Sequence, residues 1–178
     1  MGQPTLFLTV GLPCTGKTTT ARRIETEHSA LRLTKDEWVK ALYGPGNPPL
    51  PGAVIEGRLI QIGLRALELG TNVVLDYGLW SRDERSALRR AAVDLGARVE
   101  LHYCALTPSE QRRRRDQRQA DAPHTTWPMS DGELAEWAAC LDVPTPGELD
   151  GSEPIDGPPP GFTTWEQWRR HRWPPSVH

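Results

Sequence analysis

Short strand-like runs rich in apolar residues recur along the chain, with amphipathic stretches between them. They cover residues 6–10, 31–34, 71–76 and 97–106. The first run, LFLTV, is continuous rather than alternating, which is typical of a strand buried on both faces. Because such runs alternate with helical patterns, the sequence predicts an α/β fold with a mainly parallel sheet and helices on both faces.

Helical spacing of apolar residues fills the intervals. Residues 53–70 follow a helical pattern that ends at a glycine, and residues 81–96 begin with Ser81 as N-cap and Glu84 placed for a capping box. Further helices are predicted over residues 35–44, 107–120 and 130–141. The proline- and glycine-rich segment 44–52 is predicted to be a surface loop.

The chain changes character after residue 141. Residues 142–161 are rich in proline and lack periodicity, so they are predicted to be loop or extended chain. We expect a core over residues 1–141 and an extension over residues 142–178 that packs on it. The residues expected to dock the extension are Phe162, Trp165 and Trp168. A tail that binds a partner is the alternative.

The charge balance and the cysteines limit the kinds of partner and the cellular compartment that we expect. The chain has 21 Lys and Arg against 23 Asp and Glu, a net charge of −2, so no global basic field favours nucleic acid or an acidic membrane. Cys14, Cys104 and Cys140 lack metal-binding spacing and are expected to be reduced thiols of a cytoplasmic protein. No apolar run approaches the roughly 18 residues of a membrane span.

The segment GLPCTGKTTT joins the first run to a helical pattern. Its spacing, with Gly11, Gly16, Lys17 and Thr18, fits the phosphate-binding pattern G-x-x-x-x-G-K-[ST]. Backbone N–H groups at a helix N-terminus attract anions, Lys17 is placed for the β- and γ-phosphates, and Thr18 for Mg²⁺, near Asp76. ATP and Mg²⁺ are therefore the expected cofactors. The predicted nucleotide-binding residues of the loop are Gly11, Pro13, Cys14, Thr15, Gly16, Lys17, Thr18 and Thr19.

A phosphate loop alone does not identify the chemistry, because motors, GTPases and small kinases share it. A GTPase needs a base-reading [NT]-K-x-D motif well after the loop, whereas TKDE at 34–37 fails that pattern and comes too early. Motor and AAA-type assemblies need longer chains with helical lid domains. A compact phosphotransferase remains.

Four segments match a known group in order and spacing: GLPCTGKTT, TKDEW, VVLDYGLWSRDERSALRRAAVDLGA and LHYCALTPSEQRRRRDQR. They resemble the small P-loop kinases of the AAA_33 type, which include the kinase domain of polynucleotide kinases and are related to zeta toxins and chloramphenicol phosphotransferase. The resemblance implies transfer of the ATP γ-phosphoryl group to a hydroxyl, with Asp36 accepting the hydroxyl proton. It also implies a lid, over residues 107–130, that carries arginines above the phosphates. Arg115 and Arg118 match those arginines best, with Arg114 a close competitor.

The acceptor side is less specific in sequence. Aromatic residues near Asp36 are expected to line an acceptor pocket, and two arginines match positions where the resembling kinases contact substrate. The residues expected there are Asp36, Trp38, Tyr77, Trp80, Arg82 and Arg85. The alternatives are an N-capping role for Asp36, a turn-capping role for Asp76, and a solvated helix face for the two arginines.

Three functions remain open. A kinase that phosphorylates a small molecule, such as an antibiotic, nucleoside or sugar derivative, is favoured. A polynucleotide 5′-hydroxyl kinase is the alternative, which the net charge of −2 makes less favoured. A non-catalytic nucleotide-binding switch that acts through the tryptophan-rich tail is the alternative outside enzymes.

Overall fold

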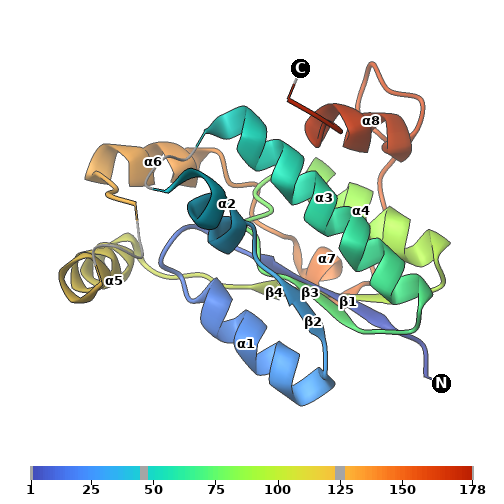
Figure 1. Ribbon diagram of the computed structural model, residues 1–178, viewed down its shortest axis with the longest axis horizontal. Helices are drawn as coiled ribbons and strands as arrows, with labels where there is room; N and C mark the ends of the chain where they lie inside the picture. Colours follow the sequence, from blue (N-terminus) through green and yellow to red (C-terminus); the bar gives the residue numbers. More distant parts are fainter. Residues whose placement is uncertain (1, 45–47, 123–126, 178) are drawn as a thin grey trace.

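The computed structural model describes residues 2–44, 48–122 and 127–177 of the 178-residue chain. Its centre is a four-stranded sheet in the order β2-β3-β1-β4, in which every neighbouring pair is parallel. The strands are β1 Thr5–Val10, β2 Leu31–Leu33, β3 Val73–Leu75 and β4 Arg98–Tyr103. Helices cover both faces of the sheet (Figure 1). The predicted α/β fold with a parallel sheet is confirmed.

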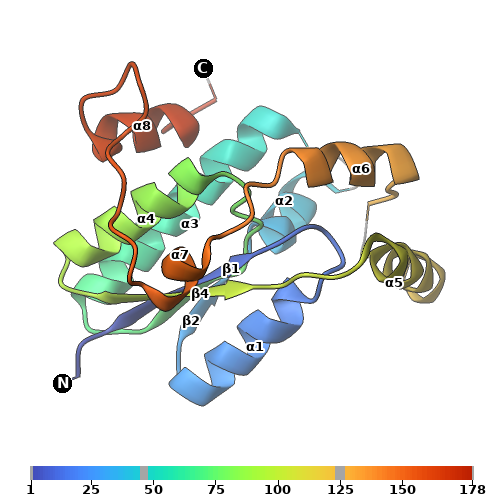
Figure 2. The ribbon, with the colours of Figure 1, turned by 180° about the vertical axis from the view of Figure 1, so that it is seen from behind.

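Two apolar cores explain the continuous apolar run of β1. Leu6 and Leu8 belong to the larger core, and Phe7 belongs to a smaller core with Ile24 of the first helix. Two of the helices that cover the sheet lie on one face and a third lies on the other, as both views show (Figures 1 and 2). These helices are α3 Pro49–Glu68 and α4 Arg82–Asp94 on one face and α1 Lys17–His28 on the other. Both faces of β1 are therefore withdrawn from solvent, and this favours apolar residues at successive positions.

Helix α3 begins earlier than the sequence pattern predicts. The surface loop expected over 44–52 is wrong for residues 49–52, because α3 starts at Pro49. Proline is tolerated in the first turn of a helix, where the N–H groups have no intrahelical partner. Residues 45–47 of the same prediction lie outside the described residues. The proline-rich segment therefore contains the first turn of α3.

The start of α4 forms as its local sequence predicts. The Ser81 hydroxyl accepts a hydrogen bond from the backbone N–H of Glu84 at 3.0 Å, and the Ser81 N–H donates to the Glu84 carboxylate at 3.2 Å. This reciprocal capping box satisfies two N–H groups that the helix itself cannot. The N-terminus of α4 is therefore fixed next to the carboxyl end of β3.

Three helices gather at one end of the sheet, where β1 and β4 end (Figures 1 and 2). They are α2 Lys35–Tyr43, α5 Pro108–Asp121 and α6 Asp131–Ala139. Residues 123–126 of the predicted lid lie outside the described residues. None of the helices in the described part of the chain is long and apolar enough to cross a membrane.

The extension after residue 141 contains two helices, α7 Pro146–Asp150 and α8 Trp165–Arg172. The expectation of irregular chain over 142–161 is wrong for α7, which is too short to show a period. Trp165, Trp168 and Trp173 are buried in the larger core, and Phe162 packs against it in a partly buried position. The indoles of neighbouring tryptophans meet nearly edge to face, at 83° and 87°.

Candidate active site

The loop between β1 and α1 depends on glycine at both ends. Gly11 has a φ of +147°, and a Cβ there would lie 2.5 Å from the carbonyl oxygen of Cys104. Gly16 has a φ of +99° and forms the N-cap of α1. Cys14 also lies in the left-handed region, with a φ of 64°, a conformation that costs a non-glycine residue about 1–2 kcal/mol. This curved backbone brings the first turn of α1 to the carboxyl end of the sheet.

Lys17, the first residue of α1, folds its side chain back on the loop. Its Nζ donates a hydrogen bond to the carbonyl oxygen of Leu12 at 2.6 Å, and the Thr15 hydroxyl donates to the same oxygen at 2.8 Å. Burial lowers the pKa of Lys17, and the negative charges of Asp76 and Asp36 oppose that shift. Lys17 is thus a partly buried cation on which the charges of two carboxylates act.

Thr18 and Asp76, the two predicted metal residues, lie together. The Thr18 hydroxyl donates to Asp76 Oδ1 at 3.3 Å, although the two residues come from α1 and from the end of β3. The Thr34 hydroxyl and Arg32 Nη1 each donate to Asp76 Oδ2 at 3.3 Å. Burial raises the pKa of Asp76, and these hydrogen bonds and charges oppose the rise. Within the described part of the chain, no group of three or more His, Cys, Asp or Glu is placed to hold a metal.

Arg32 and Thr34 are contacts of Asp76 that the sequence reasoning missed. Arg32 also forms ion pairs with Glu25 and Glu37, both at 3.1 Å. The available signal was positional: residues 31–34 end beside β3 in the parallel sheet, and polar residues at the carboxyl ends of neighbouring strands converge.

Asp36 lies in the first turn of α2, exposed to solvent. The N-cap of that helix is Thr34, so Asp36 does not cap it. Its charge acts on Lys17 from one side and on Lys40 from the other. The carboxylate is therefore exposed, and its charge acts on Lys17 of the phosphate loop.

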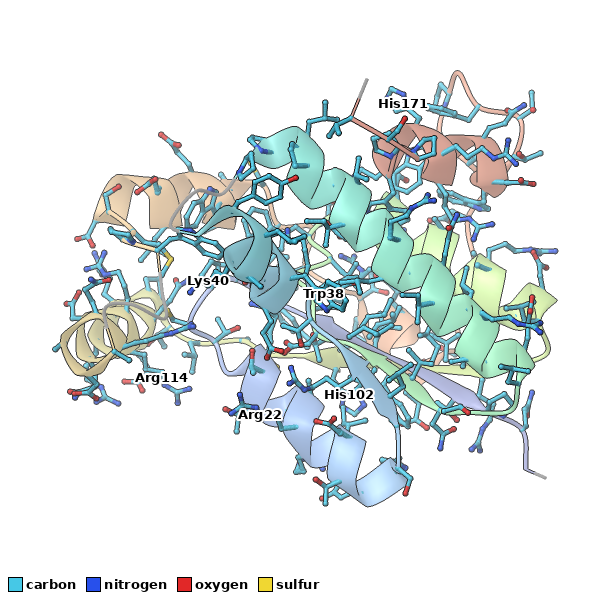
Figure 3. All side chains as sticks on the ribbon, viewed as in Figure 1. Arg22, Trp38, Lys40, His102, Arg114 and His171 are labelled. Carbon is cyan, nitrogen blue, oxygen red and sulfur yellow. The ribbon has the colours of Figure 1, made fainter. Side chains whose placement is uncertain are left out.

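The arginines of α5 divide between two surroundings. Arg114 Nη1 lies 3.6 Å from the position that a Cβ on Gly16 would take, so this guanidinium faces the phosphate loop (Figure 3). Arg115 instead forms ion pairs with Asp116 and Asp131 at 2.8 and 2.5 Å. Arg118 lies near Lys40, whose pKa is lowered by burial first and by the positive charge of Arg118 second.

Gln111 fastens α5 to the loop, a contact that the sequence gave no reason to expect. Its Nε2 donates to the carbonyl oxygen of Pro13 at 2.9 Å, and the residue is buried. Thr19, in contrast, lies on the exposed side of the first turn of α1. The helix that carries Arg114 is thus anchored directly at the predicted phosphate site.

The aromatic residues expected around the acceptor are dispersed. Trp38 lies on α2 with its side chain 52% exposed, and Lys40 lies on the same helix (Figure 3). Tyr77 is buried, and its hydroxyl lacks a hydrogen-bond partner in the described structure. Trp80 donates its indole N–H to the carbonyl oxygen of Gly11 at 3.0 Å. Only Trp38 among these residues is presented to solvent near Asp36.

Arg82 and Arg85 are paired with the extension rather than turned toward Asp36. Arg82 binds Glu153 and Asp156, and its Nε lies 2.5 Å from the latter carboxylate. Arg85 makes a two-pronged contact with Glu148 of α7, at 2.6 and 3.0 Å, with both side chains 1% exposed. The structure therefore does not bring either arginine to the predicted acceptor site, because acids far along the chain already occupy them.

Solved structures share this architecture. A chain of the Pnkp1/Rnl/Hen1 RNA repair complex matches with a TM-score of 0.66 at 20% identity, over 88% of this chain and 48% of that chain. Kti12 of Chaetomium thermophilum in complex with ADP-AlF3 gives 0.62 at 16% identity, over 79% and 82% of the two chains. A gluconokinase from Sinorhizobium meliloti 1021 gives 0.58 at 14% identity, over 84% and 81%. The present chain spans about half the length of the RNA-repair chain, and at these identities the likeness shows the fold alone.

The family follows from the sequence itself. No curated protein matches the chain significantly. The AAA_33 family, described as AAA domain, matches residues 6–142. That stretch contains the phosphate loop, Asp36, Asp76 and all of α5, the segments on which the resemblance was based. The resemblance is confirmed, and the chain belongs to the AAA_33 family of AAA domains, with the fold of a P-loop kinase.

Proposed function

We propose that the protein is a kinase that transfers the γ-phosphoryl group of ATP to a hydroxyl of a small molecule. One observation carries the proposal: Thr18, next to Lys17 in the phosphate loop, donates a hydrogen bond to Asp76 after β3 at 3.3 Å, and the charges of Asp76 and of Asp36 on α2 both act on Lys17. Lys17 lies in α1, Asp76 follows β3 and Asp36 lies in α2, so these three charged residues come from separate elements. They meet at the carboxyl edge of a parallel sheet, which is where open α/β folds bind ligands.

The residues of this edge fit the phosphates and magnesium of ATP. The backbone of Gly16 and the guanidinium of Arg114 lie close together, and both kinds of group bind anions. The oxygens of Thr18 and Asp76, 3.3 Å apart, are the kind of donor that Mg²⁺ takes. When bound, magnesium neutralises charge on the phosphate oxygens. The ADP-AlF3 in the Kti12 structure supports a nucleotide at this type of loop.

The chain's own residues then have separate tasks. Phosphoryl transfer depends on positioning and charge neutralisation more than on covalent work by the protein. Lys17 and Arg114 neutralise the phosphates, and Arg118 adds charge on the side of α2. Asp36 is exposed beside Lys17 and accepts the proton of the acceptor hydroxyl.

A compact acceptor is supported by the distribution of positive charge. Two arginines of α4 that a polyanion could have followed, Arg82 and Arg85, are occupied by Glu153, Asp156 and Glu148. The net charge of −2 adds no long-range attraction to a polyanion. Neither of these two arginines is therefore available to a polyanion.

A polynucleotide 5′-hydroxyl is the second candidate, and one local group favours it. Lys40 Nζ lies 4.5 Å from the centre of the Trp127 ring, Trp38 is 52% exposed, and Arg118 is close to Lys40. Exposed aromatic rings beside cations are the usual means of holding single-stranded nucleic acid. A nucleotide-binding switch has less support, because Trp165, Trp168 and Trp173 are buried in this chain rather than displayed to a partner.

A labelling experiment distinguishes these candidates. Purified protein, magnesium and ATP labelled at the γ-phosphate are incubated with pools of small hydroxyl compounds and, separately, with 5′-hydroxyl oligonucleotides of increasing length. We expect label to move to a small molecule with the wild-type protein and not with Asp36→Asn. Turnover that rises with oligonucleotide length and falls steeply with salt would replace the small-molecule proposal by the polynucleotide one. Binding of ATP without transfer to any acceptor would favour the switch.

A further inference from the structure

The turn between β3 and α4 holds the phosphate loop at its first residue. The Gly11 N–H donates to the carbonyl oxygen of Gly78 at 3.0 Å, and the Trp80 indole N–H donates to the carbonyl oxygen of Gly11 at 3.0 Å. Both backbone polar groups of Gly11 are thus fixed by residues 78–80. Because Gly11 is where the chain leaves β1 and bends into the loop, these two bonds set the direction of the loop.

The turn that holds the loop has an unfavourable backbone of its own. Leu79 has a φ of 46°, a left-handed conformation that is costly for a branched side chain, and it is buried. Such a conformation persists only where its surroundings fix it. The carbonyl oxygens of Leu79 and Trp80 both accept hydrogen bonds from Arg85 Nη1, at 3.1 and 3.3 Å. The Trp80 carbonyl oxygen also accepts from the backbone N–H of Asp142 at 2.9 Å, so the side chain that holds Leu79 in the turn is that of Arg85.

Arg85 is in turn oriented by the extension. Its Nε and Nη2 bind the two oxygens of Glu148 on α7, at 2.6 and 3.0 Å, and the pair is withdrawn from solvent. A buried ion pair gives little net stability over apolar residues of the same size. Its particular value is geometric, because a planar guanidinium held by a carboxylate on one edge presents its remaining N–H groups in a fixed direction. That direction is toward the carbonyls of residues 79 and 80.

We propose that Glu148 and Arg85 are positioning residues of the nucleotide site. Glu148 orients Arg85, Arg85 fixes the turn, and Trp80 transmits that geometry to the Gly11 end of the phosphate loop. The extension is on this account part of the nucleotide site, although α7 lies beside β4 and away from the loop (Figure 2). The inference rests on the proposed function for the identity of the ligand, a nucleotide.

Binding of ADP in the presence of magnesium tests the connection without an acceptor. The dissociation constant is measured by calorimetry on the full chain, at a temperature where circular dichroism shows each variant folded. Trp80→Phe removes the indole N–H and Glu148→Gln removes the charge that orients Arg85. We expect each to weaken ADP binding about 5- to 10-fold, the value of one hydrogen bond. The double variant should lose little more than the larger single loss, since both changes cut one connection.

Two controls separate this role from general loosening. Trp165→Phe removes an indole N–H that donates to the carbonyl oxygen of Asp156 at 2.9 Å within the extension, and Arg90→Gln removes the exposed ion pair between Arg90 and Asp94, at 2.9 Å, on α4. Neither contact leads to Gly11, so both variants should bind ADP as the wild type does. This holds even where their melting temperatures fall.

Four outcomes would count against the inference. Equal ADP affinity of Trp80→Phe and wild type would overturn it, as would fully additive losses in the double variant. A Glu148→Gln variant that only melts earlier would reduce the pair to a structural one. A wild-type protein that binds no ADP would overturn the proposed function, and this inference with it.

Discussion

Two arginines of α4, Arg82 and Arg85, differ from two arginines of α5, Arg113 and Arg114, in where their partners come from. Arg82 and Arg85 on α4 are bound by acids 63 to 74 residues further along the chain. On α5, Arg113 and Arg114 share Glu110 of their own helix, and no hydrogen bond or ion pair forms at the Arg118 side chain within residues 2–44, 48–122 and 127–177. A distant acid fixes an arginine as part of the fold. An arginine that has only a local, exposed partner can change partners when a ligand arrives.

Burial separates the two groups further. The side chains of Arg85 and Glu148 are each 1% exposed, whereas those of Arg113 and Arg114 are 68% and 44% exposed. Exposed pairs contribute about 0–1 kcal/mol, and breaking a buried pair costs about 3–5 kcal/mol. We therefore expect substitutions in the buried α4 pair to lower stability, in addition to their proposed effect on ADP binding. Substitutions near the loop and α5 should affect ligand binding and turnover and leave stability largely unchanged.

Lys17 gives the largest expected effect on function. Its hydrogen-bond partner is a backbone carbonyl, and burial disfavours its charge, so the fold gains little from it. Lys17→Ala should abolish phosphoryl transfer and weaken ATP binding, with the free energy of unfolding changed by less than about 1 kcal/mol. Calorimetry with ATP and chemical denaturation measure the two quantities. Arg23→Ala, which removes an exposed pair from the same helix, is the control, and unchanged ATP affinity in Lys17→Ala would contradict the phosphate-loop assignment.

Glu148 should show the opposite pattern in stability. Glu148→Ala leaves Arg85 buried and unpaired, so the free energy of unfolding should fall by about 3–5 kcal/mol. Glu110→Ala, which breaks two exposed pairs of α5, should change it by less than about 1 kcal/mol. Urea unfolding of both variants measures the difference. Similar losses in the two variants would remove the distinction between the two groups of arginines.

Asp36 should separate binding from chemistry. Asp36→Asn keeps the size of the side chain but removes the proton acceptor, so ATP should bind normally while turnover falls about 100-fold or more. Glu37→Gln alters the neighbouring carboxylate, which is paired with Arg32, and should retain most of the turnover. Lost ATP affinity with normal turnover of bound substrate would make Asp36 a structural residue.

The parts of the fold that the sequence predicted are those with local causes. Ser81 and Glu84 form their capping box three residues apart, and the first strand is apolar because both of its faces are covered. The start of α3 at Pro49 was missed because proline suits a loop and a first helical turn equally. Helix α7 was missed because five residues cannot display a period.

In the candidate site, too, the residues that could be predicted are those whose causes are local in sequence. The phosphate loop was predictable because its glycines, Lys17 and Thr18 are contiguous in sequence. Arg85 was expected at the acceptor because the resembling kinases contact substrate at this helix start. Nothing near Arg85 in the sequence indicates its partner Glu148, 63 residues away. Gln111, which reaches the carbonyl oxygen of Pro13 across 98 residues, could be found only by folding the chain.

Arg114 and Arg115 are adjacent in α5 and differ in the same way: one faces the phosphate loop and the other is held by an ion pair. Arg114 faces Gly16 of the loop, whereas Arg115 is paired with Asp131 and donates to the carbonyl oxygen of Met129. Arg114→Ala should lower turnover about 10-fold, as the loss of one charged hydrogen bond to a phosphate would. Arg115→Ala should affect turnover less and chiefly loosen the contact between α5 and α6. Steady-state kinetics and hydrogen exchange of these helices measure the two effects, and a larger kinetic loss at Arg115 would restore the assignment made from sequence.

Glu56 of α3 belongs to neither of the two groups of arginine pairs, and its substitution has the smallest expected effect on stability. Its carboxylate is buried in α3, 3.6 Å from Lys35 of α2, with Arg172 and Glu84 also acting on it. Burial raises the pKa of Glu56 above its ordinary value of 4.5, and the charges of Lys35 and Arg172 oppose the rise. The folded state therefore binds more protons than the unfolded state above about pH 4.5, so the contribution of Glu56 to stability declines as pH rises through that window.

Glu56→Gln should remove this dependence on pH. Relative to wild type, its melting temperature should rise between pH 4 and pH 7, by about 1–3 °C, the change that ~1 kcal/mol or less produces in a chain of this size. Lys35→Ala should steepen the wild-type dependence, because it removes the cation 3.6 Å from the carboxylate. Thermal unfolding at several pH values measures both variants. A melting-temperature difference between Glu56→Gln and wild type that stays constant with pH would show that Lys35 and Arg172 fully offset the burial of the carboxylate, which would place Glu56 with the paired residues of the extension.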